Sequence, residues 1–406
     1  MNNYIYKIDN KDKVRVWKAW EEGSKVFVEH GVLDGKLQQS FYTAEAKNIG
    51  KVTETTPEQQ AVIEVNALYE DQITNQHYRR SVEEAQEVKD ANLIPRKILN
   101  YKDGWKKLPD RCITSIKLNG SRACIINGKL YSKIGRPEEI QHKLIRAGVS
   151  LANSLNWGNL DCEVYAHGLS LQRIRSAWLK PIKTSKEVCE VANKRFNLKG
   201  SARIKCNVEA IKRLGYDPNQ DAQKLKLYVF DIPSKTNKGY RERLEDLETF
   251  KYLVSTSPIL QNIFEFCEYF DTVSHEERVE KLSEVHSKGY EGLVHYDPEG
   301  IYEFGKRSSN TQKAKPRLDS EALVIDVTKD KSGQGVLLLK ANDSMDNVEF
   351  KAKMKGDAES RSYEKQLQYV GKWVNYQYEE LSDKGVPTKP VVICERKCDD
   401  SGSPLE

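Results

Sequence analysis

The sequence contains no stretch of about eighteen consecutive apolar residues, which is the length that a membrane-spanning helix requires. Its first residues, MNNYIYKIDNKDKVRVW, also lack the apolar core of a secretory signal peptide. The mean hydropathy of −0.69 and the hydrophobic content of 38% are those of a polar globular protein. We therefore expect a soluble protein without a membrane partner.

Paired or clustered cysteines are missing as well. The eight cysteines have no regular spacing, and most lie inside apolar runs such as RACII and FEFCEYF. This pattern is typical of a reducing compartment rather than of a disulfide framework, so we expect a cytoplasmic protein. Cys394 and Cys398 have no further metal-ligating residues nearby, and we predict no zinc site there.

Charged residues are common in the sequence, but they are unevenly distributed along it. Residues 171–215 contain twelve Lys and Arg against three Glu, whereas residues 241–300 contain six basic and fourteen acidic residues. A solvated charged surface is the ordinary explanation of such runs. An asymmetry of this size within a net charge of +5 nevertheless favours a polyanionic partner on one side of the molecule.

A chain of 406 residues is long for one hydrophobic core, so we expect several domains. Residues 1–90 predict a small antiparallel β-meander followed by a helix, which begins at the N-cap Thr56 with Pro57 in its first turn. We expect the charged stretch SVEEAQEVKDANL to continue as helix into a linker.

The rest of the chain divides into two predicted parts. Residues 91–317 alternate strand-like runs with helical patterns, which indicates a mixed α+β domain. Within it, Asn127-Gly128 is a strong signal for a two-residue hairpin turn. Residues 318–406 contain about five strand-like runs separated by Gly-rich turns, which predicts a small barrel of the OB type.

Lys117 is the first candidate for chemistry, within the segment TSIKLNGSRACIINGKLYSKIG. A strand-like run ends on this lysine, a glycine follows, and Arg122 stands five residues on. A surface lysine in a solvated hairpin accounts for the pattern, and so does a nucleophilic lysine beside a phosphate. The pattern K-x-x-G-x-R is too short to decide between these two interpretations.

Four further segments favour the second interpretation. Glu163 in DCEVY and Glu291 in GYEGLVHYD are carboxylates beside apolar strand residues, where burial is costly without a cation, a metal or a ligand hydroxyl. Phe230 at the end of KLYVFDI is an aromatic that can cover the face of a base. Lys313 and Lys315 stand two apart, so on a strand both ammonium groups point to one side, where a phosphate chain is the natural counterion.

Together these groups meet the requirements for attack by a lysine amine on the α-phosphorus of a nucleotide. The amine must be neutral, and neighbouring cations lower its pKa. The charge that develops on phosphorus requires cations and a metal ion.

The ordered segments KLNGSR, DCEVY, YVFDI, EGLVHY and KAK, followed by the barrel pattern, resemble the covalent nucleotidyltransferases. Over roughly residues 93–400 the chain is most similar to ATP-dependent DNA ligases of the compact viral type. The stretch YEELSDKGVPTKP favours the DNA-ligase branch. This resemblance implies an α+β fold with a nucleotidyltransferase (ATP-grasp-like adenylation) domain, followed by an OB-fold β-barrel. It further implies sealing of nicks in duplex DNA with ATP and Mg²⁺ or Mn²⁺, by a monomer in the cytoplasm (the host's, if a phage encodes it).

The resemblance also implies roles for individual residues. Lys117 is expected to be the catalytic nucleophile that carries AMP, with Glu291 and Glu163 as metal ligands. The residues expected around the nucleotide are Arg122, Lys133, Glu163, Phe230, Lys313, Lys315 and Arg396. The basic tract is expected to contact DNA through Arg173, Arg175, Lys180 and Lys183. Residues 1–90 look similar to the WGR type of nucleic-acid-associated module, although a structural or protein-contact role fits their balanced charge nearly as well.

Three positions depart from the family's usual pattern. Asn119 stands where an aspartate is usual, Tyr296 where a lysine is usual, and Lys133 where an arginine is usual. Lysine cannot bind a phosphate with two parallel N–H groups as arginine does.

Three alternatives remain open from the sequence. An RNA ligase or an mRNA capping guanylyltransferase would use the same lysine chemistry, and the substitution at Asn119 keeps both under consideration. A non-catalytic DNA-binding protein that retains the fold would need the basic tract but not the convergent lysines. An NAD-dependent ligase is disfavoured because no zinc-binding cysteine cluster is present.

Overall fold

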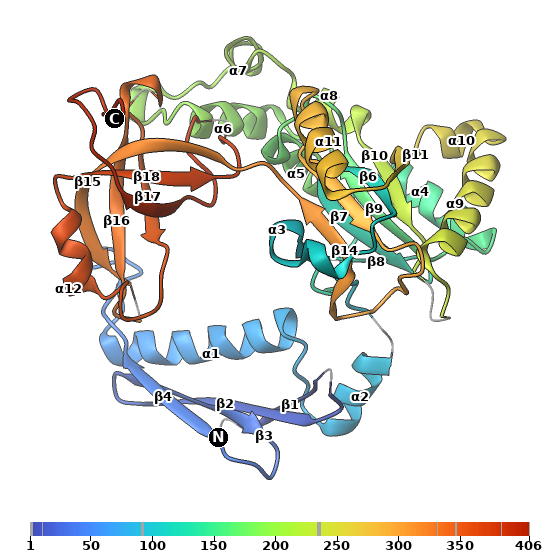
Figure 1. The fold of residues 1–406 in the computed structure, drawn as a ribbon. Coiled ribbons are helices and arrows are strands. Elements are labelled where there is room, and N and C mark those ends of the chain that lie inside the picture. Colours follow the sequence, from blue (N-terminus) through green and yellow to red (C-terminus); the bar gives the residue numbers. More distant parts are fainter. Residues whose placement is uncertain are drawn as a thin grey trace.

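The computed structural model describes residues 3–9, 11–90, 93–233, 237–330, 332–345, 347–382 and 384–405. Within these ranges, none of the helices combines the length and the apolar character needed to cross a bilayer. The fold is mixed α/β with a closed barrel at its C-terminal end, which confirms the predicted fold class (Figure 1).

The N-terminal part, which we call the N-terminal module (residues 3–90), is a four-stranded antiparallel sheet with two helices. Its strands follow the chain order β1 (Ile5–Ile8), β2 (Val14–Glu22), β3 (Lys25–Val32) and β4 (Gln38–Thr43). Helix α1 (Pro57–Asn75) begins with the predicted cap, in which Thr56 and Gln59 form a reciprocal capping box. Its Ala61 and Val65 pack on Trp17 and Val26 of the sheet.

The charged stretch after α1 forms a separate helix, α2 (Val82–Asp90), rather than a continuation of α1. The two helices are separated by the turn at residues 76–81. Residues 91 and 92 of the expected linker lie outside the described residues.

Two five-stranded sheets form the centre of the molecule. The first has the order β11-β10-β9-β7-β8 and the second the order β12-β6-β13-β14-β5. Their bounds are β5 (Lys97–Asn100), β6 (Cys112–Lys117), β7 (Ser121–Ile126), β8 (Lys129–Tyr131), β9 (Leu160–Tyr165), β10 (Lys226–Asp231), β11 (Phe264–Phe266), β12 (Tyr269–Thr272), β13 (Gly292–Tyr296) and β14 (Arg307–Ala314). The predicted hairpin at Asn127-Gly128 joins β7 to β8, and both turn residues have the positive φ that such a turn requires.

Helices accompany these sheets. They are α3 (Tyr101–Gly104), α4 (Lys143–Ser154), α5 (Leu171–Leu179), α6 (Ser185–Arg195), α7 (Asn207–Leu214), α8 (Pro218–Lys224), α9 (Tyr240–Ser255), α10 (Pro258–Gln261) and α11 (His275–Ser287). The largest hydrophobic core joins both sheets with residues from α4, α5 and α9, including Ile145, Trp178 and Phe250. Helices α6 and α7 have a small core of their own around Val188 and Leu214.

The C-terminal part is the predicted five-stranded barrel, closed in the order β15-β16-β17-β19-β18. Its elements are β15 (Leu318–Lys329), β16 (Gly335–Ala341), β17 (Glu349–Met354), α12 (Tyr363–Gln366), β18 (Trp373–Tyr378) and β19 (Val391–Glu395). Alternate residues of β15, β16 and β18, such as Val324, Leu339 and Tyr376, fill its interior.

Lys117 does not lie in a hairpin. The interpretation of its segment as a solvated hairpin with a surface lysine is therefore wrong. Strand β6 ends on Lys117 in one sheet, and β7 begins at Ser121 in the other. The chain crosses between the sheets at Leu118–Gly120. A Cβ atom on Gly120 would lie 2.4 Å from the carbonyl oxygen of Val164 and 2.6 Å from Cγ of Glu163. The glycine therefore permits the crossing to run directly against β9.

This contact yields a prediction for Gly120→Ala. The added methyl group meets backbone, which cannot rotate away, so the crossing and β9 must separate. We expect the free energy of unfolding to fall by about 1–3 kcal/mol, measured by urea denaturation. Ser121→Ala, which adds no atom in the same turn, is the control. Equal stability of Gly120→Ala and the wild type would show that the contact is not tight.

Candidate functional site

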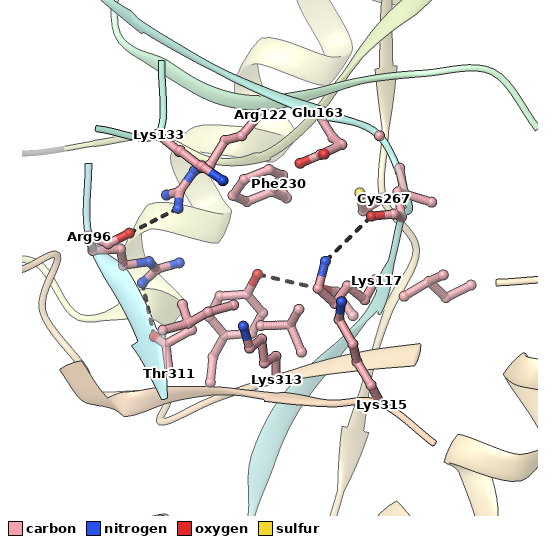
Figure 2. Close-up of a pocket in the computed structure, with 17 residues that line it drawn as sticks. Arg96, Lys117, Arg122, Lys133, Glu163, Phe230, Cys267, Thr311, Lys313 and Lys315 are labelled. Carbon is pink, nitrogen blue, oxygen red and sulfur yellow. Dashed lines mark hydrogen bonds between the residues drawn. The ribbon is translucent and has the colours of Figure 1, made fainter. Parts of the chain in front are cut away.

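A cavity of about 310 Å³ lies where the two sheets meet, and Lys117 stands at its wall. In Figure 2, Arg122, Lys133 and Phe230 lie toward one side of the space, and Lys313 and Lys315 toward the other. The residues expected at the nucleotide that line the cavity are Lys117, Arg122, Lys133, Glu163, Phe230, Lys313 and Lys315. Segments almost 200 residues apart in sequence thus converge on one space.

Glu291 binds two of these lysines. It precedes β13, whose Gly292 pairs with Lys117 in the antiparallel register of β6 and β13. One carboxylate oxygen of Glu291 accepts from Nζ of Lys117, and the other contacts Nζ of Lys315. Burial by itself would raise the pKa of Glu291, but the two ammonium groups lower it below its ordinary value. Glu291 therefore forms ion pairs with both lysines at once.

The lysines of the KAK segment differ in their partners. Lys315 lies between Glu291 and Glu379, whose oxygen is 3.1 Å away, and these carboxylates raise its pKa against the effect of burial. Lys313 has no carboxylate within ion-pair distance among the described residues. Burial, together with the neighbouring Lys315 and Lys117, lowers its pKa. Lys313 is thus a half-buried cation of the cavity without a counterion among the described residues.

Arg122 is fixed from behind by a buried carboxylate. Its Nε donates to Asp161 at 2.9 Å, and a second guanidinium nitrogen donates to the backbone oxygen of Arg96 at 2.9 Å. Tyr302 donates its hydroxyl to the same carboxylate at 2.6 Å. The guanidinium lies 5.8 Å from the centre of the Phe230 ring, so the planar cation and the aromatic ring share one end of the cavity.

A second ionic group lies deeper and was not predicted. Asp231 is completely buried and binds Arg96 at 2.6 Å and Arg243 at 2.8 Å. Arg96 also donates to Thr311 at 3.0 Å and lines the cavity. The two guanidinium groups hold the pKa of Asp231 below its ordinary value despite burial. The one signal in the sequence was Asp231 itself, which follows the apolar run at residues 227–230. Its partners Arg96 and Arg243 come from other segments and gave no signal.

Glu163 lies opposite Arg122 in the register of β7 and β9. Burial raises its pKa to about 7, and the nearby Lys117 and Arg122 only partly oppose this effect. The carboxyl group is therefore poised to change charge near neutral pH. Asp161 and Glu163 stand two apart on the same strand, which is the pattern that could have indicated Asp161 as well.

Two of the departures from the family pattern have visible consequences. The side-chain amide of Asn119 donates a hydrogen bond to Glu380 of the barrel at 2.6 Å. An ionised aspartate has no N–H group and could not make this bond. Tyr296 stacks on Tyr240 with ring centres 3.8 Å apart, and its ring lies 5.1 Å from the guanidinium of Arg96. A cation therefore remains at this wall although the expected lysine is absent.

Arg396 does not line this cavity. It is exposed at the end of β19, and its backbone N–H donates to Trp373 at 2.9 Å, at the start of β18. Glu379, which reaches the cavity through Lys315, follows the other end of β18. At about 3.3 Å per residue, the two ends are about 20 Å apart. Arg396 can act at the nucleotide only if the barrel moves.

The four residues expected to contact DNA divide into two pairs. Arg175 and Lys180 are exposed, with Lys180 paired to Glu187. Arg173 binds Asp221 through two hydrogen bonds and stacks on Tyr216. Lys183 is buried and donates to the carbonyls of Ser176 and Lys180, which end α5. The structure therefore gives Arg173 and Lys183 internal partners.

The cavity offers few protein ligands for a metal ion. Within the described residues, no group of three or more His, Cys, Asp or Glu side chains is arranged to hold one. Mg²⁺ in nucleotide sites is commonly bound by one or two carboxylates together with substrate phosphates and water. Glu291 and Glu163 are carboxylates beside Lys117, which is compatible with that mode.

The fold and the cavity define a nucleotidyltransferase-type domain followed by an OB-type barrel. The family model of the ATP dependent DNA ligase domain matches residues 95–315, just over half of the chain. The chain belongs to this ATP-dependent DNA ligase family. No match was found among the curated proteins.

Solved structures share the fold at low sequence identity. A Lig E DNA ligase, studied for DNA binding with a minimal scaffold, is 19% identical with a TM-score of 0.55, over 75% of this chain and 99% of its own. The structure called Pmar-Lig_Pre is 18% identical with a TM-score of 0.55, over 75% of this chain and 67% of its own.

The position of Glu163 yields a prediction about pH. Its folded-state pKa of about 7 lies above the ordinary value of 4.5, so the neutral carboxyl group favours folding. This stability is fully present below about pH 4.5 and is lost as the pH rises through about 7, by up to about 3 kcal/mol. We expect Glu163→Gln to remove this loss when urea unfolding is compared between pH 5 and 8.

The exposed Glu190 on α6 provides the control, and Glu190→Gln should keep the pH dependence of the wild type. Parallel pH profiles for Glu163→Gln and the wild type would contradict the assignment of this titration to Glu163.

Proposed function

We propose that this protein seals nicks with 5′-phosphate and 3′-hydroxyl ends in duplex DNA, using ATP and a lysyl-AMP intermediate on Lys117. The observation that carries this proposal is the position of Lys117 between two different sets of groups. On one side are the cations Lys313 and Lys315, and on the other are Phe230 and Arg122. A nucleotide bound across this cavity would have its base beside Phe230 and its phosphates beside the lysines.

In the first step, the neutral amine of Lys117 attacks the α-phosphorus of ATP. A phosphorus–nitrogen bond forms, the bond to the β-phosphate oxygen breaks, and pyrophosphate leaves with its electron pair. The hydrogen bond between Lys117 and Glu291 must open before this attack. Entry of an anion beside Lys315 and Lys313 would rearrange these ion pairs, and the two lysines would stabilise the charge on the phosphates.

DNA supplies the nucleophile in the second and third steps. Lys117 is the leaving group of the second step, and AMP is the leaving group of the third. An oxygen of the nick's 5′-phosphate attacks the phosphorus of the lysyl-AMP and forms a phosphorus–oxygen bond. The phosphorus–nitrogen bond breaks, and the nitrogen of Lys117 takes up a proton and leaves as the free amine. The 3′-hydroxyl then attacks the 5′-phosphate and gives up its proton, and AMP leaves. A metal ion would be held by Glu291 and Glu163 together with phosphate oxygens, and it would stabilise the negative charge of the phosphates.

Helices α5 to α7 support a contact with the DNA backbone. The exposed basic residues of this segment include Arg175, Lys194, Lys199, Arg203 and Lys205. For these residues, the described part of the chain offers no carboxylate at ion-pair distance. A cleft of about 400 Å³ between α5, α6 and the barrel brings Lys194 and Arg195 together with Lys384. Unpaired cations on adjoining elements fit a run of phosphates.

Two other functions are weighed against this one. An RNA ligase or a capping guanylyltransferase would use the same cavity, but the family match favours a DNA ligase. A non-catalytic DNA-binding protein would not require a lysine in contact with Glu291 beside two further lysines. We further propose that residues 1–90, 91–317 and 318–406 act as three domains of one cytoplasmic monomer.

The lysyl-AMP step predicts the behaviour of Lys117→Ala. Incubation of the wild type with α-labelled ATP and Mg²⁺ should give label that survives denaturation and is released by acid. Lys117→Ala should give no labelled band and should bind DNA as well as the wild type does, because its fold and basic surface are kept. Lys107→Ala, a change of the same size outside the cavity, is the control.

Retained sealing by Lys117→Ala would exclude the mechanism. Label from GTP in place of ATP would indicate a capping-type enzyme. No label from any nucleotide, even after bound AMP has been removed with pyrophosphate, would indicate a non-catalytic DNA-binding protein.

The DNA surface predicts the behaviour of the double variant Arg175→Ala/Lys194→Ala. It should form lysyl-AMP at the normal rate but bind nicked duplex DNA more weakly. Each lost phosphate contact should reduce the slope of log affinity against log salt concentration by about 1. The control Lys281→Ala/Lys288→Ala removes two surface lysines that are paired with Glu284. Equal salt slopes for the two double variants would place the DNA elsewhere.

A further inference from the structure

The N-terminal module contacts the loop that carries Lys133. The ring nitrogen Nε2 of His77 makes a hydrogen bond with the backbone oxygen of Ile134, which is the residue after Lys133. His77 lies in the turn between α1 and α2, whereas Lys133 lines the cavity beside Arg122 (Figures 1 and 2). One side chain thus connects the module to the wall of the nucleotide cavity.

The loop at residues 132–135 is a tight turn. The N–H of Gly135 donates to the carbonyl of Ser132 at 2.8 Å, and the N–H of Ser132 donates to Arg136 at 2.9 Å. These bonds leave the carbonyl of Ile134 directed at His77. The turn also packs closely, because a Cβ atom on Gly135 would lie 2.8 Å from Ile94 and 3.1 Å from the His77 ring. The position of Lys133 therefore depends on what stands behind the turn.

The backbone at His77 indicates that its side chain has a use. His77 follows the end of α1 with a φ of 63°, in the left-handed region. A left-handed residue directly after a helix end is ordinarily glycine, and here the N–H of the next residue, Tyr78, donates back to the carbonyl of Gln72 at 3.0 Å. Histidine is strained there and glycine is not. The contacts of the His77 ring with Ile134 and Gly135 offset this strain.

The imidazole is suited to donate to a carbonyl. His77 is buried, and burial lowers its pKa, as do the nearby cations Lys7, Arg79 and Lys97. The ring is therefore neutral near pH 7, and the tautomer with the proton on Nε2 donates to the oxygen of Ile134. The contact forms without burying a charge between the two parts of the chain.

We propose that His77 is a positioning residue for ATP: by holding the turn at Ile134, the N-terminal module fixes Lys133 at the nucleotide cavity. This inference rests on the proposed function for the identity of the nucleotide. It assigns the module a part in the affinity for ATP, through Lys133, and requires no contact between the module and DNA.

The test uses His77→Gly in the full-length protein. Glycine removes the imidazole and relieves the backbone strain, so the melting temperature should not fall. ATP affinity should fall about five-fold, which corresponds to one net hydrogen bond. Binding is measured at equilibrium with labelled ATP in the Lys117→Ala background, where no turnover occurs. His77→Gln, which keeps an N–H donor at similar reach, should restore most of the affinity.

A double-mutant cycle shows whether the effect passes through Lys133. If it does, the loss of affinity in His77→Gly/Lys133→Ala should be close to that of Lys133→Ala alone. His30→Gly, a change at another histidine of the module, is the control. Unchanged ATP affinity in His77→Gly, or additive losses in the double variant, would overturn the proposal. Failure of the wild type to form lysyl-AMP would instead count against the proposed function and leave this binding comparison intact.

Discussion

The carboxylate of Glu291 is the interaction on which the arrangement of the cavity depends. Without it, the ammonium groups of Lys117 and Lys315 would face each other in a partly buried space, with Lys313 beside them. Two ammonium groups that share one carboxylate lie close together, and like charges repel strongly when water is excluded. Glu291 offsets this repulsion with one oxygen for each lysine. The same contact engages Nζ of Lys117, so attack by this nitrogen requires the ion pair with Glu291 to open.

The ion pairs continue from Glu291 into the barrel. Lys315 binds Glu379, and Glu379 binds Lys389 at 2.6 Å, so charges of opposite sign alternate from β6 to the loop after β18. A phosphate that approaches Lys315 meets Glu379 as a competitor for the same ammonium group. Polyphosphate binding and this barrel contact therefore oppose each other. The position of Arg396 at the far end of β18 also requires barrel movement before that side chain can reach a nucleotide.

Periodicity and turn chemistry are local signals, and the features that they encode were predictable. The helix after Thr56, the turn at Asn127-Gly128 and the five strands of the barrel all follow from short stretches of sequence. The site residues that line the cavity came from ordered segments rather than from any one pattern. The sheet order was not predictable: a glycine after Lys117 fits a hairpin equally well, and only the pairing of β6 with β13 shows that the chain changes sheets. Partners distant in sequence, such as Asp161 for Arg122 and Ser176 for Lys183, were missed for the same reason.

The buried group of Arg96, Asp231 and Arg243 explains why a tyrosine is acceptable at position 296. A lysine there would bring another cation next to Arg96, whose guanidinium lies 5.1 Å from the Tyr296 ring. Asp231 already serves two arginines, so an added cation would have no counterion of its own among the described residues. An arginine also keeps its charge when buried, whereas a buried lysine loses its proton readily. The cavity thus retains a permanent cation at this wall through Arg96, and the aromatic ring covers it.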